Sequence, residues 1–405
     1  MPLQNQYSMK SIDQFNFKGK KALVRVDYNV PLNENGEVES TTRIDRTVAT
    51  VKKITEDGGT AILMSHLGRP KGEVVPSMSL KHIVKTVSKI MGQEVIFLGD
   101  VLDENVKAKI GELKSGDIGI LENLRFHKEE EKGDVEFSKK MASLGDVYVN
   151  DAFGTAHRAH ASTTVIAQFF PNNAYAGYLL YNEVFNLEKT LIHCERPLTI
   201  IVGGSKISTK IEIIESLLNK ADNLIFTGGM CYTFLKAFGE NIGNSLCEPD
   251  MLDTAMDILK KAYKKGVNVI LPIDSVCGDR YAEDANIMVT ENNTIPDGWM
   301  GLDIGPKTIA RFADVIKNSA TILWNGPAGV FEFDRFAKGT QATALCVAAA
   351  TVAGAYSLVG GGDTISAIKK CGLSNYISYI STGGGAMLEY LEGKILPGIA
   401  ALQEN

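Results

Sequence analysis

The chain lacks the features that mark exported, membrane-spanning and zinc- or disulfide-stabilised proteins. No uninterrupted run of about 18 apolar residues occurs, and the N-terminal segment 1–15 has no apolar signal core. The six cysteines all lie between Cys194 and Cys371 and form no CxxC pair. We therefore expect a soluble, cytoplasmic protein whose thiols are reduced.

Two familiar nucleotide-binding signatures are also missing. There is no GxxxxGK[ST] loop, and no GxGxxG followed about 20 positions later by an acidic residue. The formal net charge of −6 argues against a surface that binds nucleic acid or membrane as a whole. We expect neither of these partners, and clustered arginines in such a chain indicate a local site for a small anion.

The chain does contain short β-branched runs that alternate with longer amphipathic segments. This alternation predicts βαβ units, and hence an α/β fold of parallel sheets with helices on both faces. A chain of 405 residues is longer than one hydrophobic core usually serves, so two Rossmann-like domains are expected. Helices are predicted over these segments: Ser79 to Met91, Val135 to Leu144, Lys210 to Lys220, Asp250 to Lys265 and Lys307 to Asn318.

The predicted domain boundaries follow the same pattern. An N-terminal domain is expected over residues 1–176 and a C-terminal domain over 197–388. Between them, 177–196 is predicted as a stiff connector helix that Pro197 stops. The last residues, 389–405, are expected to form an arm that packs back on the N-terminal domain.

In the second half, five apolar runs open into glycine turns: LTIIVGGSK, NLIFTGGM, TILWNGPAG, YSLVGGGDT and ISYISTGGGA. Glycine after a strand lets backbone N–H groups approach a polyphosphate, and a following helix N-terminus adds partial positive charge. One such loop is more often a plain tight turn. Five of them in one half favour a nucleotide site.

Two of these loops carry charged side chains. Lys206 precedes a helix expected to begin near Ser208, and Lys210 shares its face if the helix already includes it. Two ammonium groups at a helix N-terminus are unfavourable, so an anionic ligand is indicated. Asp363 in another loop can hold Mg²⁺ that bridges phosphates. Thr364 is expected in the first helical turn with its hydroxyl and N–H free to donate.

Glu332 and two histidines leave alternatives open. Glu332 follows the WNGPAGVF run and is either an acceptor for ribose hydroxyls or a solvated glutamate at a helix start. His157 and His160 lack a third metal-type ligand at suitable spacing, which disfavours zinc.

In the first half, cationic side chains follow the apolar runs. Because the carboxyl ends of parallel strands meet at one edge of a sheet, we expect these cations to converge there. Guanidinium groups bind phosphate bidentately. Asp27 and Asn29 can fix a substrate hydroxyl, or cap the turn at Pro31. Arg25 lies inside a predicted strand, where a structural ion pair is the favoured role. The expected anion-binding cations are Arg43, His66, Arg69, Arg125 and Arg158.

Taken together, the motifs resemble those of the phosphoglycerate kinases in order and spacing, from about Lys18 to Leu402. The matching motifs are RVDYNVP, SHLGRP, LENLRFHKEE, VNDAFGTAHRAHAS, GGSKISTK, GLDIGP, WNGPAGVFE, GGGDT and STGGGA. Departures are small. Ala328 stands where a larger apolar residue is common, Ser205 where alanine is common, and Thr209 where aspartate is frequent.

The resemblance implies which residues bind which substrate. The N-terminal domain would bind 3-phosphoglycerate or 1,3-bisphosphoglycerate through Asp27, Asn29, Arg43, His66, Arg69, Arg125 and Arg158. The C-terminal domain would bind ADP or ATP with Mg²⁺ through Lys206, Lys210, Gly228, Gly229, Gly301, Asn325, Glu332, Gly361, Gly362, Asp363 and Thr364, with Asp363 as the metal ligand.

The implied reaction moves a phosphoryl group between the C1 carboxylate of phosphoglycerate and the β-phosphate of ADP. Both acceptors are already ionised, so no general base is required and catalysis rests on positioning and charge stabilisation. Lys206 and Arg43 would stabilise the transferring oxygens, with N–H groups at the helix starts of Gly362 and Gly385. The domains must close on each other, with the connector helix and loop 381–386 as hinge candidates. A monomer is expected.

Two other classes of protein remain as alternatives. A two-domain anion-binding protein without catalysis would need neither Lys206 nor Asp363. A nicotinamide-dependent oxidoreductase is disfavoured by the missing dinucleotide motif.

Overall fold

The computed structural model describes residues 9–290 and 294–403, and the chain within it divides into two compact units. The first unit runs to Phe185 and takes up the chain again from Ile395, and the second spans Asn186–Lys394. Among the described residues, no helix is both long enough and apolar enough to cross a membrane.

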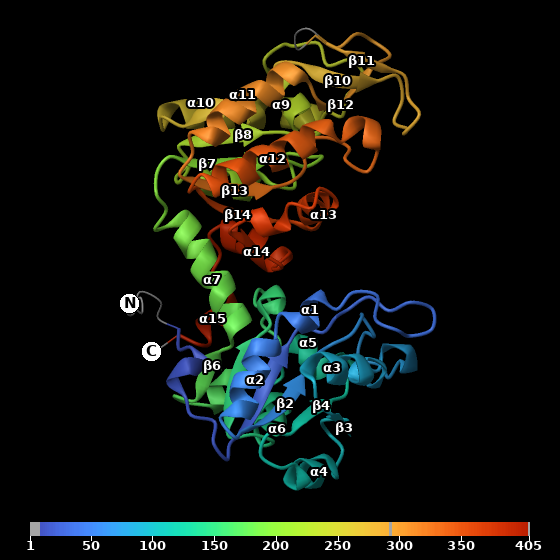
Figure 1. Ribbon diagram of the computed structural model, residues 1–405, viewed down its shortest axis with the longest axis vertical. Helices are drawn as coiled ribbons and strands as arrows, with labels where there is room; N and C mark the ends of the chain where they lie inside the picture. The colour runs from blue at the N-terminus through green and yellow to red at the C-terminus, as the bar shows by residue number, and fades with distance from the viewer. Residues whose placement is uncertain (1–8, 291–293, 404–405) are drawn as a thin grey trace. The chain divides into compact units, whose positions relative to one another are not determined.

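The first unit is built on a six-stranded parallel sheet (Figure 1). Its strands, in sheet order, are β3 (Val95–Gly99), β4 (Ile118–Leu121), β2 (Thr60–Met64), β1 (Lys21–Val26), β5 (Val147–Asp151) and β6 (Ala174–Ala176). The helices are α1 (Thr42–Asp45), α2 (Val48–Glu56), α3 (Val84–Met91), α4 (Val106–Glu112), α5 (Lys128–Lys132), α6 (Val135–Ala142) and α15 (Pro397–Ala400). Helix α7 (Tyr178–Leu191) contains the boundary between the units.

The second unit repeats this plan with a second six-stranded parallel sheet. In sheet order its strands are β15 (Tyr379–Ile380), β14 (Tyr356–Gly360), β13 (Thr321–Asn325), β7 (Leu198–Val202), β8 (Asn223–Phe226) and β9 (Asn268–Ile270). The helices are α8 (Ile211–Leu217), α9 (Cys231–Ala237), α10 (Leu252–Lys264), α11 (Pro306–Lys317), α12 (Lys338–Val352), α13 (Gly362–Lys370) and α14 (Gly385–Leu391).

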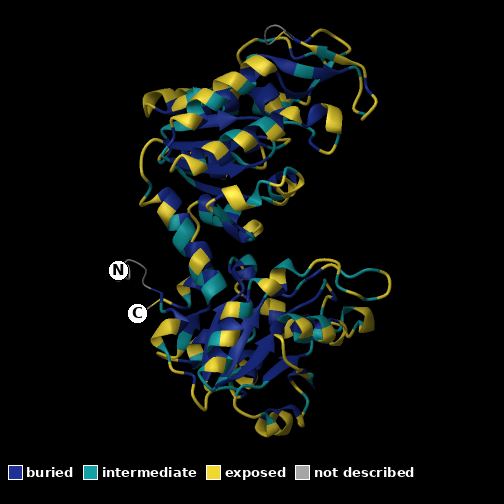
Figure 2. Ribbon diagram, viewed as in Figure 1, coloured by how far each residue is buried: buried dark blue, intermediate teal, exposed yellow. Residues whose placement is uncertain are grey.

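The two helix-covered parallel sheets confirm the predicted α/β class. Central strands β2, β7 and β13 are buried along their whole length, as expected for strands covered on both faces. Figure 2 shows buried residues along the sheets and exposed residues on the outer faces of the helices. The core of the second unit includes Trp324, whose buried indole N–H donates to Gly326 O at 2.7 Å.

A third sheet was not predicted from the sequence. It is a small antiparallel sheet of β10 (Ser275–Gly278), β11 (Ile287–Val289) and β12 (Met300–Ile304), in the order β11-β10-β12. The sequence pattern suggested only parallel units, because these strands are short and β11 is largely exposed. This sheet carries Gly301, one of the expected nucleotide-binding residues.

Helix ends follow local capping chemistry. Helix α6 begins where the Asp134 side chain accepts the Phe137 N–H at 2.8 Å, and α3 ends at Gly92 in the left-handed conformation. Helix α7 follows β6, and its first turn is held by Asp151, the last residue of β5, whose buried carboxylate accepts the Leu179 N–H at 2.8 Å. Burial raises the pKa of Asp151 to about 7.

Candidate active site

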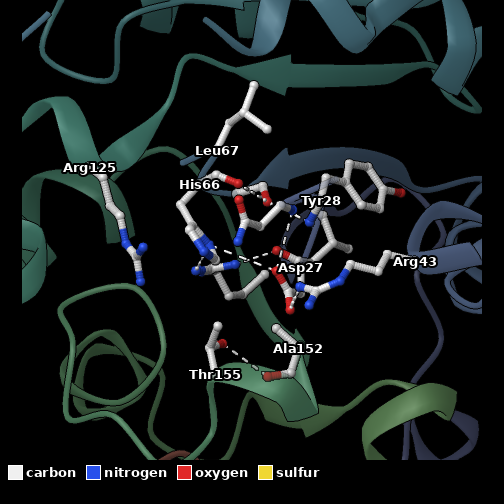
Figure 3. A network of polar contacts seen from close by, with 12 residues as sticks. Asp27, Tyr28, Arg43, His66, Leu67, Arg125, Ala152 and Thr155 are labelled. Atoms are coloured by element: carbon white, nitrogen blue, oxygen red, sulfur yellow. Dashed lines mark hydrogen bonds and ion pairs between the residues drawn. The ribbon is translucent and has the colours of Figure 1, made fainter. Parts of the chain in front are cut away.

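The carboxyl ends of β1 and β2 bring an acid, an arginine and a histidine together. Asp27 follows β1, and Arg43 of α1 forms an ion pair with its Oδ2 atom. His66 follows β2, and its Nδ1 atom lies 3.9 Å from Asp27 Oδ1. Figure 3 shows Arg43 and His66 on opposite sides of Asp27. Arg43 is 44% exposed whereas Asp27 is 12% exposed, so the pair presents its cation to solvent.

Asn29 joins the loops that follow these two strands. Its Oδ1 atom accepts the Gly68 N–H at 2.8 Å, and its own N–H donates to Asp27 Oδ1 at 3.3 Å. Asn29 therefore supports the positions of both loops, through its side-chain oxygen and its backbone N–H. The loop after β2 also carries Arg69, which is exposed to solvent.

Arg125 is the most buried of the predicted substrate-binding arginines. It lies in a short 3-10 helix, Leu124–Phe126, and its Nη1 donates to Gly68 O at 3.0 Å. Its Nε lies 3.5 Å from Glu131 Oε1. Burial lowers the pKa of Arg125, and nearby positive charges such as that of Arg158 add to the effect. Arg158 itself is exposed on the loop after β5.

Two buried histidines accompany these arginines and are neutral. Burial holds the pKa of His66 well below 6.5, and the positive charges of Arg25, Arg125 and Arg43 lower it further. Burial and the same kind of neighbours lower the pKa of His160 to about 4. These electrostatic couplings connect Arg43, Arg125 and Arg158 to one cluster around the two histidines. Sequence analysis weighed His160 only as a metal ligand and did not place it in this cluster.

In the second unit, a cavity of about 470 Å³ lies among the glycine loops. Of the predicted nucleotide-binding residues, the following line it: Gly228, Gly229, Gly301, Glu332 and Asp363. Glu332 is exposed and lines the cavity, and its role as an acceptor for ribose hydroxyls stays a prediction. Sequence analysis missed the side chains of Leu246, Tyr281 and Met300 that also line it, because only the fold assembles them there.

Lys206 and Lys210 would share a helical face only if the helix included Lys210, and the expected helix start near Ser208 was wrong. Helix α8 begins at Ile211, and Lys210 precedes it with φ −131°. Lys210 Nζ donates to Gly203 O and to Asn325 Oδ1, both at 2.6 Å. Lys206 is exposed on the loop after β7. Burial lowers the pKa of Lys210 to about 8, while the negative charge of Asp363 opposes this shift.

Helix α13 begins at Gly362, after Gly361 with φ +92°. Asp363 is exposed in its first turn. Thr364 also lies in this turn, but it is fully buried and its Oγ1 accepts the Gly326 N–H at 2.8 Å. The hydroxyl oxygen therefore accepts a hydrogen bond within the fold, which leaves its own O–H as a donor, so the expected donor role stays a prediction. Gly385 is the first residue of α14 and is exposed.

Three glycine loops beside the cavity touch one another through their backbones. A Cβ atom on Gly203 would lie 2.4 Å from Pro327 O, and one on Gly326 would lie 2.3 Å from the carbonyl carbon of Gly203. A Cβ on Gly228 would lie 2.8 Å from Gly204 N. Contacts this short leave no room for a side chain, so these loops require glycine.

The metal-binding groups at this cavity suit a Mg²⁺ ion that is held partly by the phosphates of a bound ligand. Among residues 9–290 and 294–403, no group of three His, Cys, Asp or Glu side chains is placed to hold a metal ion. Asp363 offers one carboxylate at the cavity. Mg²⁺ is commonly bound by one or two carboxylates together with waters and substrate phosphates, so a single aspartate fits that use.

Comparison with known proteins gives one consistent result. A family model described as phosphoglycerate kinase matches residues 12–394. A phosphoglycerate kinase of Porphyromonas gingivalis is 52% identical, covering 97% of this chain and 100% of the relative. Cytosolic phosphoglycerate kinase 3 of Arabidopsis thaliana is 49% identical, with 98% of each chain covered.

Two solved structures have the same fold. The phosphoglycerate kinase of Coxiella burnetii matches with a TM-score of 0.90 and 42% identity, covering 97% of this chain and 98% of the other. That of Pyrococcus horikoshii matches with a TM-score of 0.81 and 30% identity, with the same coverage.

We predict that His66 and His160 do not take up a proton as the pH falls through 6.5. Below that pH the unfolded chain binds protons at these residues and the folded chain does not, so both residues reduce the stability of the fold as the pH falls. An NMR pH titration of the ring protons, assigned with H66Q and H160Q, should give a midpoint for His160 of about 4. Midpoints near 6.5 for both would contradict the prediction.

Proposed function

The chain belongs to the phosphoglycerate kinase family, and we propose that it catalyses the reversible, Mg²⁺-dependent transfer of a phosphoryl group from 1,3-bisphosphoglycerate to ADP, a step of glycolysis. Relatives about half identical over nearly the whole chain make it a phosphotransferase rather than a non-catalytic binding protein or an oxidoreductase. The observation that carries the finer proposal is the separation of chemistries: a cation cluster in one unit and a glycine-lined cavity in the other.

In the first unit, the proposed ligand is the phosphoglycerate. Its phosphate and carboxylate need cations and hydrogen-bond donors, which Arg43, Arg69, Arg125, Arg158 and His66 supply. Asp27 and Asn29 would bind the hydroxyl between these two anionic groups. The ion pair of Asp27 with Arg43 supports this assignment, because it holds a carboxylate acceptor beside an exposed cation.

In the second unit, the proposed ligand is ADP or ATP. Three glycines that line the cavity, Gly228, Gly229 and Gly301, allow close approach of the nucleotide. Gly361, which precedes α13, would do the same. Glu332 would bind the ribose, while Lys210 and Asn325 would act near the phosphates. Mg²⁺, held through Asp363, would neutralise phosphate charge when bound. Thr364 would contribute donors from the same helix start, while its hydroxyl oxygen accepts the Gly326 N–H.

The chemistry requires no general base. A carboxylate and a phosphate are both ionised near neutral pH, so the catalytic task is to align them and offset their negative charge. Lys206 and Arg43 are both exposed, which suits cations that contact the phosphoryl group during its transfer. N–H groups at Gly362 and Gly385 would add donors at the starts of α13 and α14.

The activity is tested by a coupled assay for ATP-dependent formation of 1,3-bisphosphoglycerate from 3-phosphoglycerate and Mg²⁺. We expect K206A and R43A each to lower kcat about a hundredfold, since loss of one charge-stabilising group typically costs about 3 kcal/mol. K52A and R311A remove exposed charges on α2 and α11 and serve as controls with unchanged rates. A folded wild type that binds both ligands without turnover would rule out the kinase.

We propose that the two units close on each other when both substrates are bound, because each substrate is assigned to a different unit. Closure would exclude water that would otherwise hydrolyse the acyl phosphate. Helix α7 and loop 381–386 are the hinge candidates. Small-angle scattering should show a smaller radius of gyration with both ligands than with either alone. We also propose that the enzyme is cytoplasmic and a monomer. The same scattering data give the mass, which should then be that of one chain.

A pH effect on nucleotide binding follows from Lys210. Its pKa of about 8 means that its ammonium group loses a proton in the free protein as the pH rises through that value. A bound polyphosphate favours the charged form, so ADP affinity should fall between about pH 7 and 9, with proton uptake on binding near pH 8. Calorimetry in buffers of different ionisation enthalpy measures this uptake. Undiminished proton uptake in K210M would assign it to another group.

A further inference from the structure

Arg25 is a buried cation near the carboxyl end of strand β1, and the residue is only 1% exposed. Its Nε donates to Ser162 Oγ at 2.7 Å, its Nη1 to the carbonyl of Val26, and its Nη2 lies 3.2 Å from His66 Nδ1. A guanidinium has donors only and stays charged, so burying it requires acceptors and a compensating negative charge.

The compensating carboxylate is Glu130 on α5, which is fully buried. It accepts two hydrogen bonds from Ser162: the hydroxyl at 2.5 Å and the backbone N–H at 3.0 Å. The Ser162 hydroxyl therefore accepts from Arg25 and donates to Glu130 in one consistent direction. Burial raises the pKa of Glu130, while the charge of Arg25 and the Ser162 hydrogen bonds act in the opposite direction.

This chain of contacts decides which nitrogen of His66 carries the proton. Because Arg25 Nη2 can only donate, His66 Nδ1 must accept, which leaves the proton of the neutral ring on Nε2. Asp27 Oδ1 is 3.9 Å from the same Nδ1, beyond hydrogen-bond range, and would favour the opposite tautomer. No described residue supplies a partner for Nε2, so its N–H is left for a ligand.

We propose that Glu130 and Ser162 are positioning residues: through Arg25 they fix His66 as the Nε2–H tautomer, so that it donates a hydrogen bond to an anionic oxygen of phosphoglycerate. That the accepting oxygen belongs to phosphoglycerate rests on the proposed function. Phosphate and carboxylate oxygens accept hydrogen bonds and do not donate them. The other tautomer would direct a lone pair at the substrate, so the fixed proton position contributes to binding.

A purely structural role for Glu130 is the competing explanation. Its backbone carbonyl accepts the Ala161 N–H at 2.9 Å, so the residue also anchors the loop that carries Arg158. Loss of a structural anchor would lower stability without moving the proton of His66. The tautomer of His66 is therefore the measurement that separates the two explanations.

The tautomer is read from long-range ¹H–¹⁵N spectra of the full chain with labelled histidine, with His66 assigned through H66Q. We expect Nε2–H in the wild type, and a mixture of tautomers in E130Q and S162A. E129Q changes an exposed neighbour on the same helix and should match the wild type. An Nδ1–H or doubly protonated ring in the wild type overturns the proposal even if no variant folds. So does an unchanged tautomer in folded E130Q and S162A.

Binding gives the second readout. Affinity for 3-phosphoglycerate, measured by calorimetry, should fall roughly tenfold to hundredfold in E130Q, as for loss of one hydrogen bond to a charged group. ADP affinity should stay unchanged. An equal loss for both ligands would indicate general destabilisation and contradict the proposal. If the wild type binds phosphoglycerate in the expected tautomer but lacks kinase activity, the proposed function fails while the positioning role of Glu130 stands.

Discussion

Concentrating positive charge at one edge of a sheet costs free energy, and the first unit is organised around that cost. Arg25 and Arg125 are both buried there, and Arg43 and Arg158 are close enough to affect the pKa values of the same histidines. The fold limits the repulsion by keeping the histidines neutral and by placing carboxylates behind the arginines. Asp27, Glu130 and Glu131 each face one part of the cluster.

The second unit attracts negative charge by different means. Its loops offer backbone N–H groups and helix starts, and its half-buried Lys210 already donates hydrogen bonds to Gly203 O and Asn325 Oδ1. A backbone donor carries only a partial charge, so several can be packed together without the repulsion that buried cations suffer. This difference explains why one half of the sequence is rich in arginine motifs and the other in glycine motifs.

The sequence predicted what depends on local pattern and missed what depends on distant partners. The parallel sheets and the helices α6, α8, α10 and α11 follow from period and composition. The start of α8 was misjudged because Lys210 turns away to Asn325, which lies 115 positions further along the chain. The hydrogen bond that the Thr364 hydroxyl accepts was missed for the same reason, since its partner is the distant Gly326. Glu130 sits in a run of three glutamates that resembles a solvated surface, and only the fold reveals that it is buried.

The interlocked glycine loops beside the cavity also limit how this protein can change by mutation. A side chain on Gly203, Gly326 or Gly228 would need space that the backbone of another of these loops already occupies. None of these glycines can therefore be replaced unless another loop moves. The compensating changes would have to occur in segments that are far apart in the sequence. These loops can therefore change only together. Single substitutions are left to other residues that line the cavity, such as Leu246 and Tyr281.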